Sequence, residues 1–80
     1  IKAVISSDLS FGKAPLIVKF DGSDSVGDLI EWQWDFGNGF TSKEINPSHR
    51  YTTPGIYEVK LRVKDSKGLL NTKKVQIVVE

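Results

Sequence analysis

The sequence predicts an all-β fold in which two sheets of short strands, about seven strands in total, pack face to face as a β-sandwich. Three observations support this prediction. Apolar and polar residues alternate along most of the chain, as in strands with one buried face. Turn-forming residues recur about every 8–12 positions, which is the spacing typical of a sandwich. No stretch of about ten residues repeats its apolar positions with the period of a helix.

The first half of the chain is predicted to contain three strands. The first covers residues 2–6, and a loop over residues 7–15 separates it from the second, residues 16–21. The inward face of the second strand is predicted to carry Leu16, Val18 and Phe20. After a polar loop over residues 22–28, the third strand covers residues 29–36. The side chains predicted to share its buried face are Ile30, Trp32, Trp34 and Phe36.

The third strand ends at Gly37-Asn38-Gly39, where the sequence predicts a hairpin turn. Asn-Gly is the pair most typical of two-residue hairpins, because both residues tolerate the positive φ that these turns require. The chain is therefore expected to return as a short strand over residues 40–43.

Three further strands are predicted in the second half, over residues 47–51, 56–64 and 70–79. Pro54-Gly55 predicts a type II turn, in which proline presets φ at the first central position and glycine supplies a positive φ at the second. A four-residue turn over residues 65–68 precedes the last strand. The side chains predicted to point inward are Tyr57, Val59, Leu61, Val63, Val75, Ile77 and Val79.

The chain length sets the domain organisation. Eighty residues suffice for one hydrophobic core, so residues 1–80 are predicted to form a single domain. Trp34 lies near the middle of the chain on a predicted central strand, as the core tryptophan of an immunoglobulin-like sandwich does. Because the sequence begins and ends in strand-like segments, we expect one domain of a larger multidomain protein.

Composition argues against several classes of function. Eleven Lys and Arg against ten Asp and Glu give a net charge of +1, without the basic excess of nucleic-acid-binding proteins. No apolar run approaches the length that spans a membrane, so membrane insertion is not expected. The chain contains no Cys, which removes disulfides and thiolate metal ligands. We expect a monomer as the isolated domain.

The segment Trp34-Asp35-Phe36-Gly37-Asn38-Gly39 resembles the W-D-F-G-D-G signature of the PKD domain, an immunoglobulin-like repeat. Five of the six signature positions are identical, and Asn38 stands where the family usually has a second Asp. The resemblance covers nearly the whole chain. It includes Ala14-Pro15-Leu16 ahead of the second strand and, further on, Tyr51, Pro54, Gly55 and Tyr57.

This resemblance implies a non-catalytic, extracellular or cell-surface module. Such modules act as spacers, or as adhesion domains that anchor a secreted enzyme, such as a protease or a glycoside hydrolase, to its substrate. The implied partners are neighbouring domains of the same chain and polysaccharide or extracellular protein. The alternative is a dedicated carbohydrate- or collagen-binding module of a secreted hydrolase that uses an exposed aromatic side chain. An enzyme is not expected, because no nucleophile with a base and no converging carboxylate pair is present.

Three groups of polar residues are possible sites, and for each of them a structural role is the favoured interpretation. Asp21, Asp24 and Asp28 crowd one loop, so they are the candidate ligands if calcium binds, although a solvated loop with Asx turns is the favoured interpretation and no cofactor is expected. His49 is the only histidine and is expected to pack or hydrogen-bond beside Tyr51. Asp35 is expected to accept backbone N–H bonds and fix the hairpin.

Three aromatic residues are the candidate ligand-binding platform, because flat exposed rings stack on sugars and collagen-like ligands. They are Trp32, Phe40 and Phe11, with burial in the core as the favoured interpretation for Trp32. A basic row on one strand, Lys60, Arg62 and Lys64, is expected to be a solvated face with cross-strand pairing to Glu58.

Overall fold

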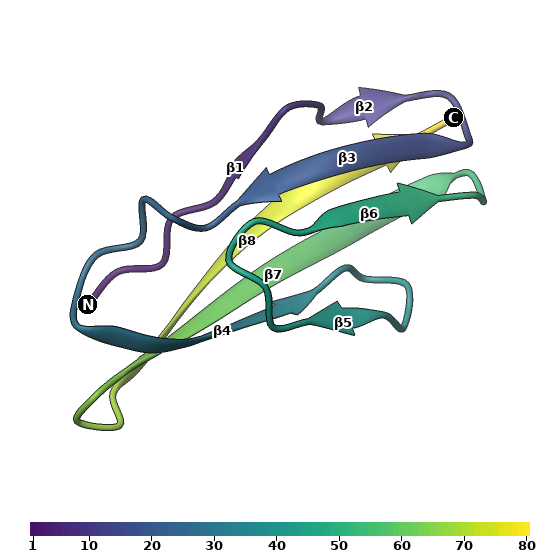
Figure 1. The fold of residues 1–80 in the computed structure, drawn as a ribbon. Helices are drawn as coiled ribbons and strands as arrows, with labels where there is room; N and C mark the ends of the chain where they lie inside the picture. Colours follow the sequence, from purple (N-terminus) through teal and green to yellow (C-terminus); the bar gives the residue numbers. More distant parts are fainter.

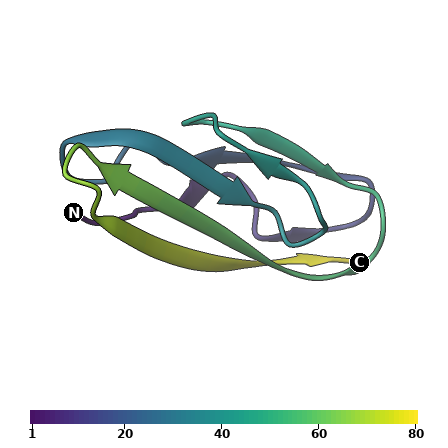
Figure 2. The same cartoon turned by 90° about the horizontal axis from the view of Figure 1, so that it is seen from below.

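The computed structural model describes residues 1–80 and confirms the predicted all-β sandwich. It contains eight short strands rather than about seven, arranged in two sheets. Figure 1 shows the two sheets as layers that overlie each other, and Figure 2 shows the same layers from below. One sheet has the order β1-β3-β6, with β1 Ser6–Ser7, β3 Leu16–Asp21 and β6 Ser48–Tyr51. The other has the order β2-β8-β7-β4-β5, with β2 Phe11–Gly12, β4 Leu29–Asp35, β5 Thr41–Ser42, β7 Gly55–Asp65 and β8 Leu70–Val79.

The antiparallel pair β7 and β8 is the longest element of the fold. Its register runs from Gly55↔Val79 to Lys64↔Leu70 without interruption. Both strands are rich in β-branched residues, which favour the pleated conformation. Gly68, at φ +85°, closes the turn between them, because a left-handed conformation there is accessible to glycine. None of the elements is a helix that could cross a membrane.

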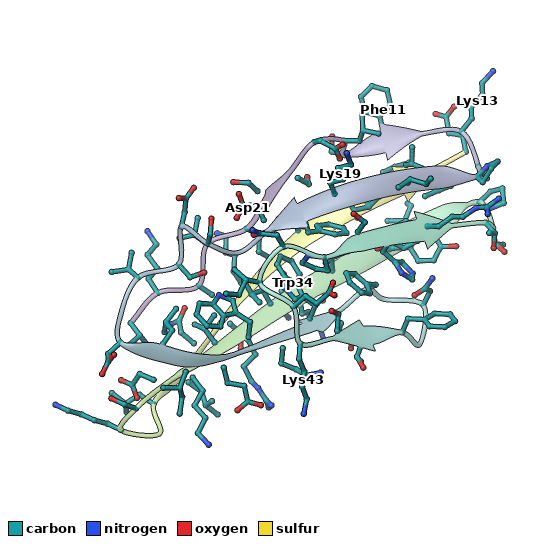
Figure 3. The ribbon with its side chains drawn as sticks, viewed as in Figure 1. Phe11, Lys13, Lys19, Asp21, Trp34 and Lys43 are labelled. Atoms are coloured by element: carbon teal, nitrogen blue, oxygen red, sulfur yellow. The ribbon has the colours of Figure 1, made fainter.

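The inward-facing rows of the two sheets form one core between the layers. Trp34, from β4, is fully buried and lies between the sheets (Figure 3). Its indole Nε1 donates to the carbonyl oxygen of Glu44 at 2.8 Å, so its single polar group is paired. The other buried apolar residues of this core are Ala3, Leu16, Val18, Phe20, Phe36, Tyr51, Val59, Leu61, Val63, Ile77 and Val79.

The start of β4 differs from the prediction. The register against β7 shifts between Leu29 and Glu31, which is a β-bulge. The extra residue turns the Ile30 side chain to solvent, where 61% of it is exposed, and Leu29 packs against the core instead. The prediction that Ile30 shares the buried face of Trp34 is therefore wrong, because strict alternation fails at a bulge.

Two turns also differ from their predicted types. In the hairpin after β4, the positive φ angles belong to Gly37 and Gly39 (+83° and +91°), not to Asn38. The loop is therefore longer than an Asn-Gly turn, and β5 returns with Thr41 opposite Asp35. Gly55 has no positive φ and is the first residue of β7, so the predicted type II turn at Pro54-Gly55 is wrong.

The N-terminal segment is divided between the two sheets. Instead of one strand over residues 2–6, Lys2 makes an isolated bridge to Val26, and β1 pairs with β3. The chain then crosses to the other sheet, where β2 pairs in parallel with β8 inside the stretch predicted to be a loop. Neither piece is longer than two residues, which explains why the sequence pattern does not reveal β2.

The molecule is elongated, with principal extents of 40 × 21 × 16 Å. In both views the N-terminus and the C-terminus lie at opposite ends of the long dimension (Figures 1 and 2). A chain that enters at one end of the sandwich therefore leaves at the other.

Candidate functional site

The signature segment from Trp34 to Gly39 forms the end of β4 and the hairpin after it. Asp35 Oδ1 accepts the backbone N–H of Gly37 at 2.9 Å, so the carboxylate is directed into the turn. The hydroxyl of Tyr51 donates to the carbonyl oxygen of Phe36 at 2.9 Å, which ties the hairpin to the opposite sheet. Burial raises the pKa of Tyr51, so the phenol remains a donor. These contacts close the turn and tie the hairpin to β6 of the opposite sheet.

A small cluster of side chains lies beside this hairpin, and we call Asn38, Phe40 and His49 the tip cluster. Phe40 is 63% exposed, and its ring centre lies 5.5 Å from that of His49. The imidazole stacks on buried Phe36 at 4.3 Å with an interplanar angle of 4°. The amide nitrogen and oxygen of Asn38 lie 2.9 Å and 3.2 Å from His49 Nε2, so the tautomer of the ring sets whether it accepts from this amide or donates to it. The cluster therefore presents an aromatic face next to an amide.

Partial burial of His49 lowers its pKa from 6.5, because desolvation disfavours the imidazolium. The ring meets Tyr51 edge-on at 4.8 Å, and no Asp, Glu, Lys or Arg makes an ion pair with it. His49 thus packs and hydrogen-bonds beside Tyr51, as the sequence indicated. Nε2 of the ring is engaged by the side-chain amide of Asn38.

We expect the domain to lose stability as the pH falls just below 6.5, because of His49. The folded state binds fewer protons here than the unfolded chain, so the free energy of unfolding rises with pH through this window and falls on acidification. Urea denaturation at about pH 7.5 and about pH 5 measures the difference. In His49→Gln, which keeps a polar partner for Asn38, the difference shrinks. An unchanged pH dependence in that variant contradicts the assignment.

Trp32 does not form an exposed platform. Its side chain is half-buried and packs against the core, and its Nε1 donates to the carbonyl oxygen of Gly22 at 3.1 Å. Phe11 is 69% exposed, on β2 at one edge of the five-stranded sheet, and in Figure 3 its ring points away from the body of the molecule. Phe40 immediately precedes β5, at the opposite edge of that sheet. The three predicted aromatic residues therefore do not share one surface.

The three loop carboxylates do not gather into a metal site. No group of three or more His, Cys, Asp or Glu side chains lies close enough to hold an ion. Asp21 Oδ1 accepts the backbone N–H of Ser23 at 2.7 Å and also its hydroxyl, and these bonds lower the pKa of Asp21. Asp28 Oδ2 instead accepts the hydroxyl of Ser66 at 2.7 Å. Asp21 is therefore used in local hydrogen bonds, Asp28 bonds to the turn between β7 and β8, and Asp24 is exposed.

Two shallow polar grooves were not foreseen from the sequence. One, of about 450 Å³, is lined by Ser6, Ser7, Asp8, Lys19, Phe20, Asp21, Asn46 and Ser48, and Figure 3 shows Lys19 and Asp21 on this side. The other, of about 330 Å³, lies on the outer face of the five-stranded sheet and is lined by Gln33, Asp35, Thr41, Lys60, Arg62 and Thr72. Because each groove joins residues from several strands, no local sequence signal marks it.

The basic row lies on that outer face. Glu58 pairs with Lys60 at 3.8 Å and, across the strands, with Lys74 at 3.6 Å. These ion pairs are exposed and contribute little to stability. Arg62 lies between Gln33 and Thr72 in register, without an acidic partner. The face is thus a solvated, mixed-charge surface with a small positive excess.

Comparison with known proteins identifies a family. A family model described as "PKD domain" matches residues 10–79. The chain is 44% identical over 82 residues to "Collagenase ColA" of Clostridium perfringens, covering 96% of this chain and 7% of that protein. It is 47% identical over 58 residues to "Pre-pro-metalloprotease PrtV" of Vibrio cholerae, covering 72% of this chain and 6% of that protein. The chain thus spans less than a tenth of the length of either relative.

Solved structures agree with the fold. The PKD1 domain of the Vibrio cholerae metalloprotease PrtV superposes with a TM-score of 0.84 at 34% identity, covering 99% of this chain and 95% of that chain. A structure described as "carbohydrate-binding modules from the beta-sandwich super family" gives a TM-score of 0.90 at 29% identity, covering 98% of this chain but 33% of that chain. The similarity in the second case is therefore to about one third of the larger molecule.

Proposed function

This chain belongs to the PKD domain family, a family of non-catalytic modules, and from that premise we propose that it acts as a rigid spacer in a longer, secreted or cell-surface protein. One observation carries the proposal. The two termini lie at opposite ends of a sandwich 40 Å long, so the module holds the domain before it apart from the domain after it (Figure 1). The relatives named collagenase and metalloprotease support an extracellular setting beside a hydrolase domain.

A rigid module and a flexible linker differ in the spread of distances that they allow between the two flanking domains. A Gly/Ser chain of the same length has a root-mean-square end-to-end distance of roughly 50 Å with a broad distribution. The experiment replaces residues 1–80 of the longer protein by such a linker and measures the distance between spin labels in the flanking domains by pulsed electron resonance. We expect a narrow distribution with the native module and a broad one with the linker. Equal widths contradict a spacer role.

A second candidate function is a collagen- or carbohydrate-binding module, and the tip cluster supports it. Phe40 is largely exposed and has the polar groups of Asn38 and His49 beside it, which suits stacking combined with hydrogen bonding. The names of the collagenase relatives and of the carbohydrate-binding neighbour give the two ligand classes. We do not propose that Trp32 binds the ligand, because its side chain is half-buried and hydrogen-bonded to the backbone.

If the second candidate is correct, the isolated domain adsorbs saturably to insoluble collagen, chitin or cellulose, and Phe40→Ala weakens adsorption by at least about tenfold. Phe11→Ala is the matched control, because Phe11 is similarly exposed (69% against 63%) at the opposite edge of the sheet. Circular dichroism confirms that both variants are folded. No adsorption by the wild type rules out these three ligands, and equal adsorption by Phe40→Ala rules out the tip cluster.

A further inference from the structure

Three apolar side chains stand side by side on the outer face of the five-stranded sheet. Phe11 of β2 is in register with Val78 of β8, and Val78 is in register with Ile56 of β7. Phe11 and Ile56 are each 69% exposed, and Val78 is half-buried between them. Their neighbours Tyr57 and Val79 face the other way, into the sandwich. We call Phe11, Val78 and Ile56 the apolar row.

The apolar row differs from the middle of this face, and the next exposed apolar side chain along β8 on this face, Leu70, lies at the far end of the strands opposite Lys64. The next cross-strand pairs along β7 and β8 are Glu58↔Gln76, then Lys60↔Lys74, then Arg62↔Thr72. A solvated sheet face normally carries polar residues of this kind. Adjacent aromatic and aliphatic side chains left in water favour a contact that covers them.

We propose that the apolar row is the docking surface for the domain that comes after Glu80 in the longer protein. The inference rests on the proposed role as one module of such a protein. The chain leaves the sandwich directly beside the row, because Glu80 N–H donates to the carbonyl oxygen of Gly12 at 2.7 Å. Ala14 N–H in turn donates to the carbonyl oxygen of Glu80 at 2.8 Å. Figure 1 shows the C-terminus next to β2.

The apolar row is small, which favours a domain of the same chain over a separate protein as its binding partner. Side chains of this kind, exposed to this degree, offer on the order of 300 Å². A specific complex between free proteins buries about 800 Å² on each partner. A domain held by a short linker has an effective concentration in the millimolar range, so a contact with a Kd near 1 mM is still about half formed. The occupant is therefore expected to present an aliphatic or aromatic contact surface close to its own N-terminus.

Hydroxyl-radical footprinting of the intact longer protein tests this, because it reports side-chain exposure without substitutions. Phe40, 63% exposed, is the matched control for Phe11, and Ile30, 61% exposed, is the matched control for Ile56. We expect Phe11 and Ile56 to be oxidised about half as fast as their controls, because a contact that is about half formed leaves the row exposed for about half of the time. Equal rates within each pair overturn the proposal.

A second measurement identifies the occupant. Ending the longer protein at Glu80 removes every domain on the C-terminal side of the module and leaves those on its N-terminal side. We expect the oxidation rates of Phe11 and Ile56 then to rise to those of Phe40 and Ile30. If the row stays protected, its occupant is a preceding domain or a second copy, and the proposal is wrong. Both results are independent of the linker replacement, which tests the spacer role without reference to the row.

Discussion

Trp34→Ala is expected to lower the free energy of unfolding by about 3–5 kcal/mol, the largest loss from any single truncation in this core. A domain of this length has a total stability of roughly 4–12 kcal/mol, so the loss removes between about a quarter and all of it. The indole is fully buried and its ring centre lies 5.4 Å from that of Phe20 and 6.4 Å from that of Phe36. Truncation opens a cavity between the sheets and leaves the Glu44 carbonyl without its donor.

Urea denaturation followed by circular dichroism measures this loss, with Trp32→Ala as the control. Trp32 is half-buried and also bonds a backbone carbonyl, so its truncation removes a hydrogen bond of the same kind but less buried surface. We expect Trp32→Ala to be the milder variant by at least about 1 kcal/mol. Equal losses in the two variants are incompatible with a core centred on Trp34.

The sequence predicts the core better than it predicts the surface. Alternation places Trp34, Leu61 and Val63 inside because each lies on a regular strand with one buried face. The same rule fails for Ile30, because a bulge adds a residue to one strand of a pair and reverses the facing of the residue at that point. A bulge depends on the partner strand, here β7, and has no signal in the local sequence.

The candidate surfaces depend on contacts between distant segments. The sequence marks Phe11 as a candidate but not its neighbours Val78 and Ile56, because β2 is predicted to be a loop and its pairing with β8 joins opposite ends of the chain. The two polar grooves are not predicted either, because each is formed by residues from several strands. The sequence identifies Phe40 and His49 as individual residues of interest, but it does not predict that they are in contact. Their contact depends on how the hairpin after β4 approaches β6.

The two positive-φ glycines of the hairpin after β4, Gly37 and Gly39, differ in how much space surrounds them. A Cβ at Gly37 would lie 2.7 Å from the carbonyl oxygen of Glu58 and 3.0 Å from its nitrogen, both backbone atoms of the central strand β7. A Cβ at Gly39 would meet nothing within 4 Å. Both positions have a left-handed φ, which costs an L-residue about 1–2 kcal/mol.

We therefore expect Gly39→Ala to destabilise the domain by about 1–2 kcal/mol, the cost of the φ angle alone. Gly37→Ala carries the same strain and adds an overlap with backbone that cannot move aside, for a total of about 3 kcal/mol or more. Comparing the two variants by urea denaturation isolates the overlap, because the conformational cost cancels. Equal destabilisation would mean that β7 yields to the added methyl group. A larger loss at Gly37 means that the first glycine of the signature is required by the close approach of the hairpin to β7, and the second only by its φ angle.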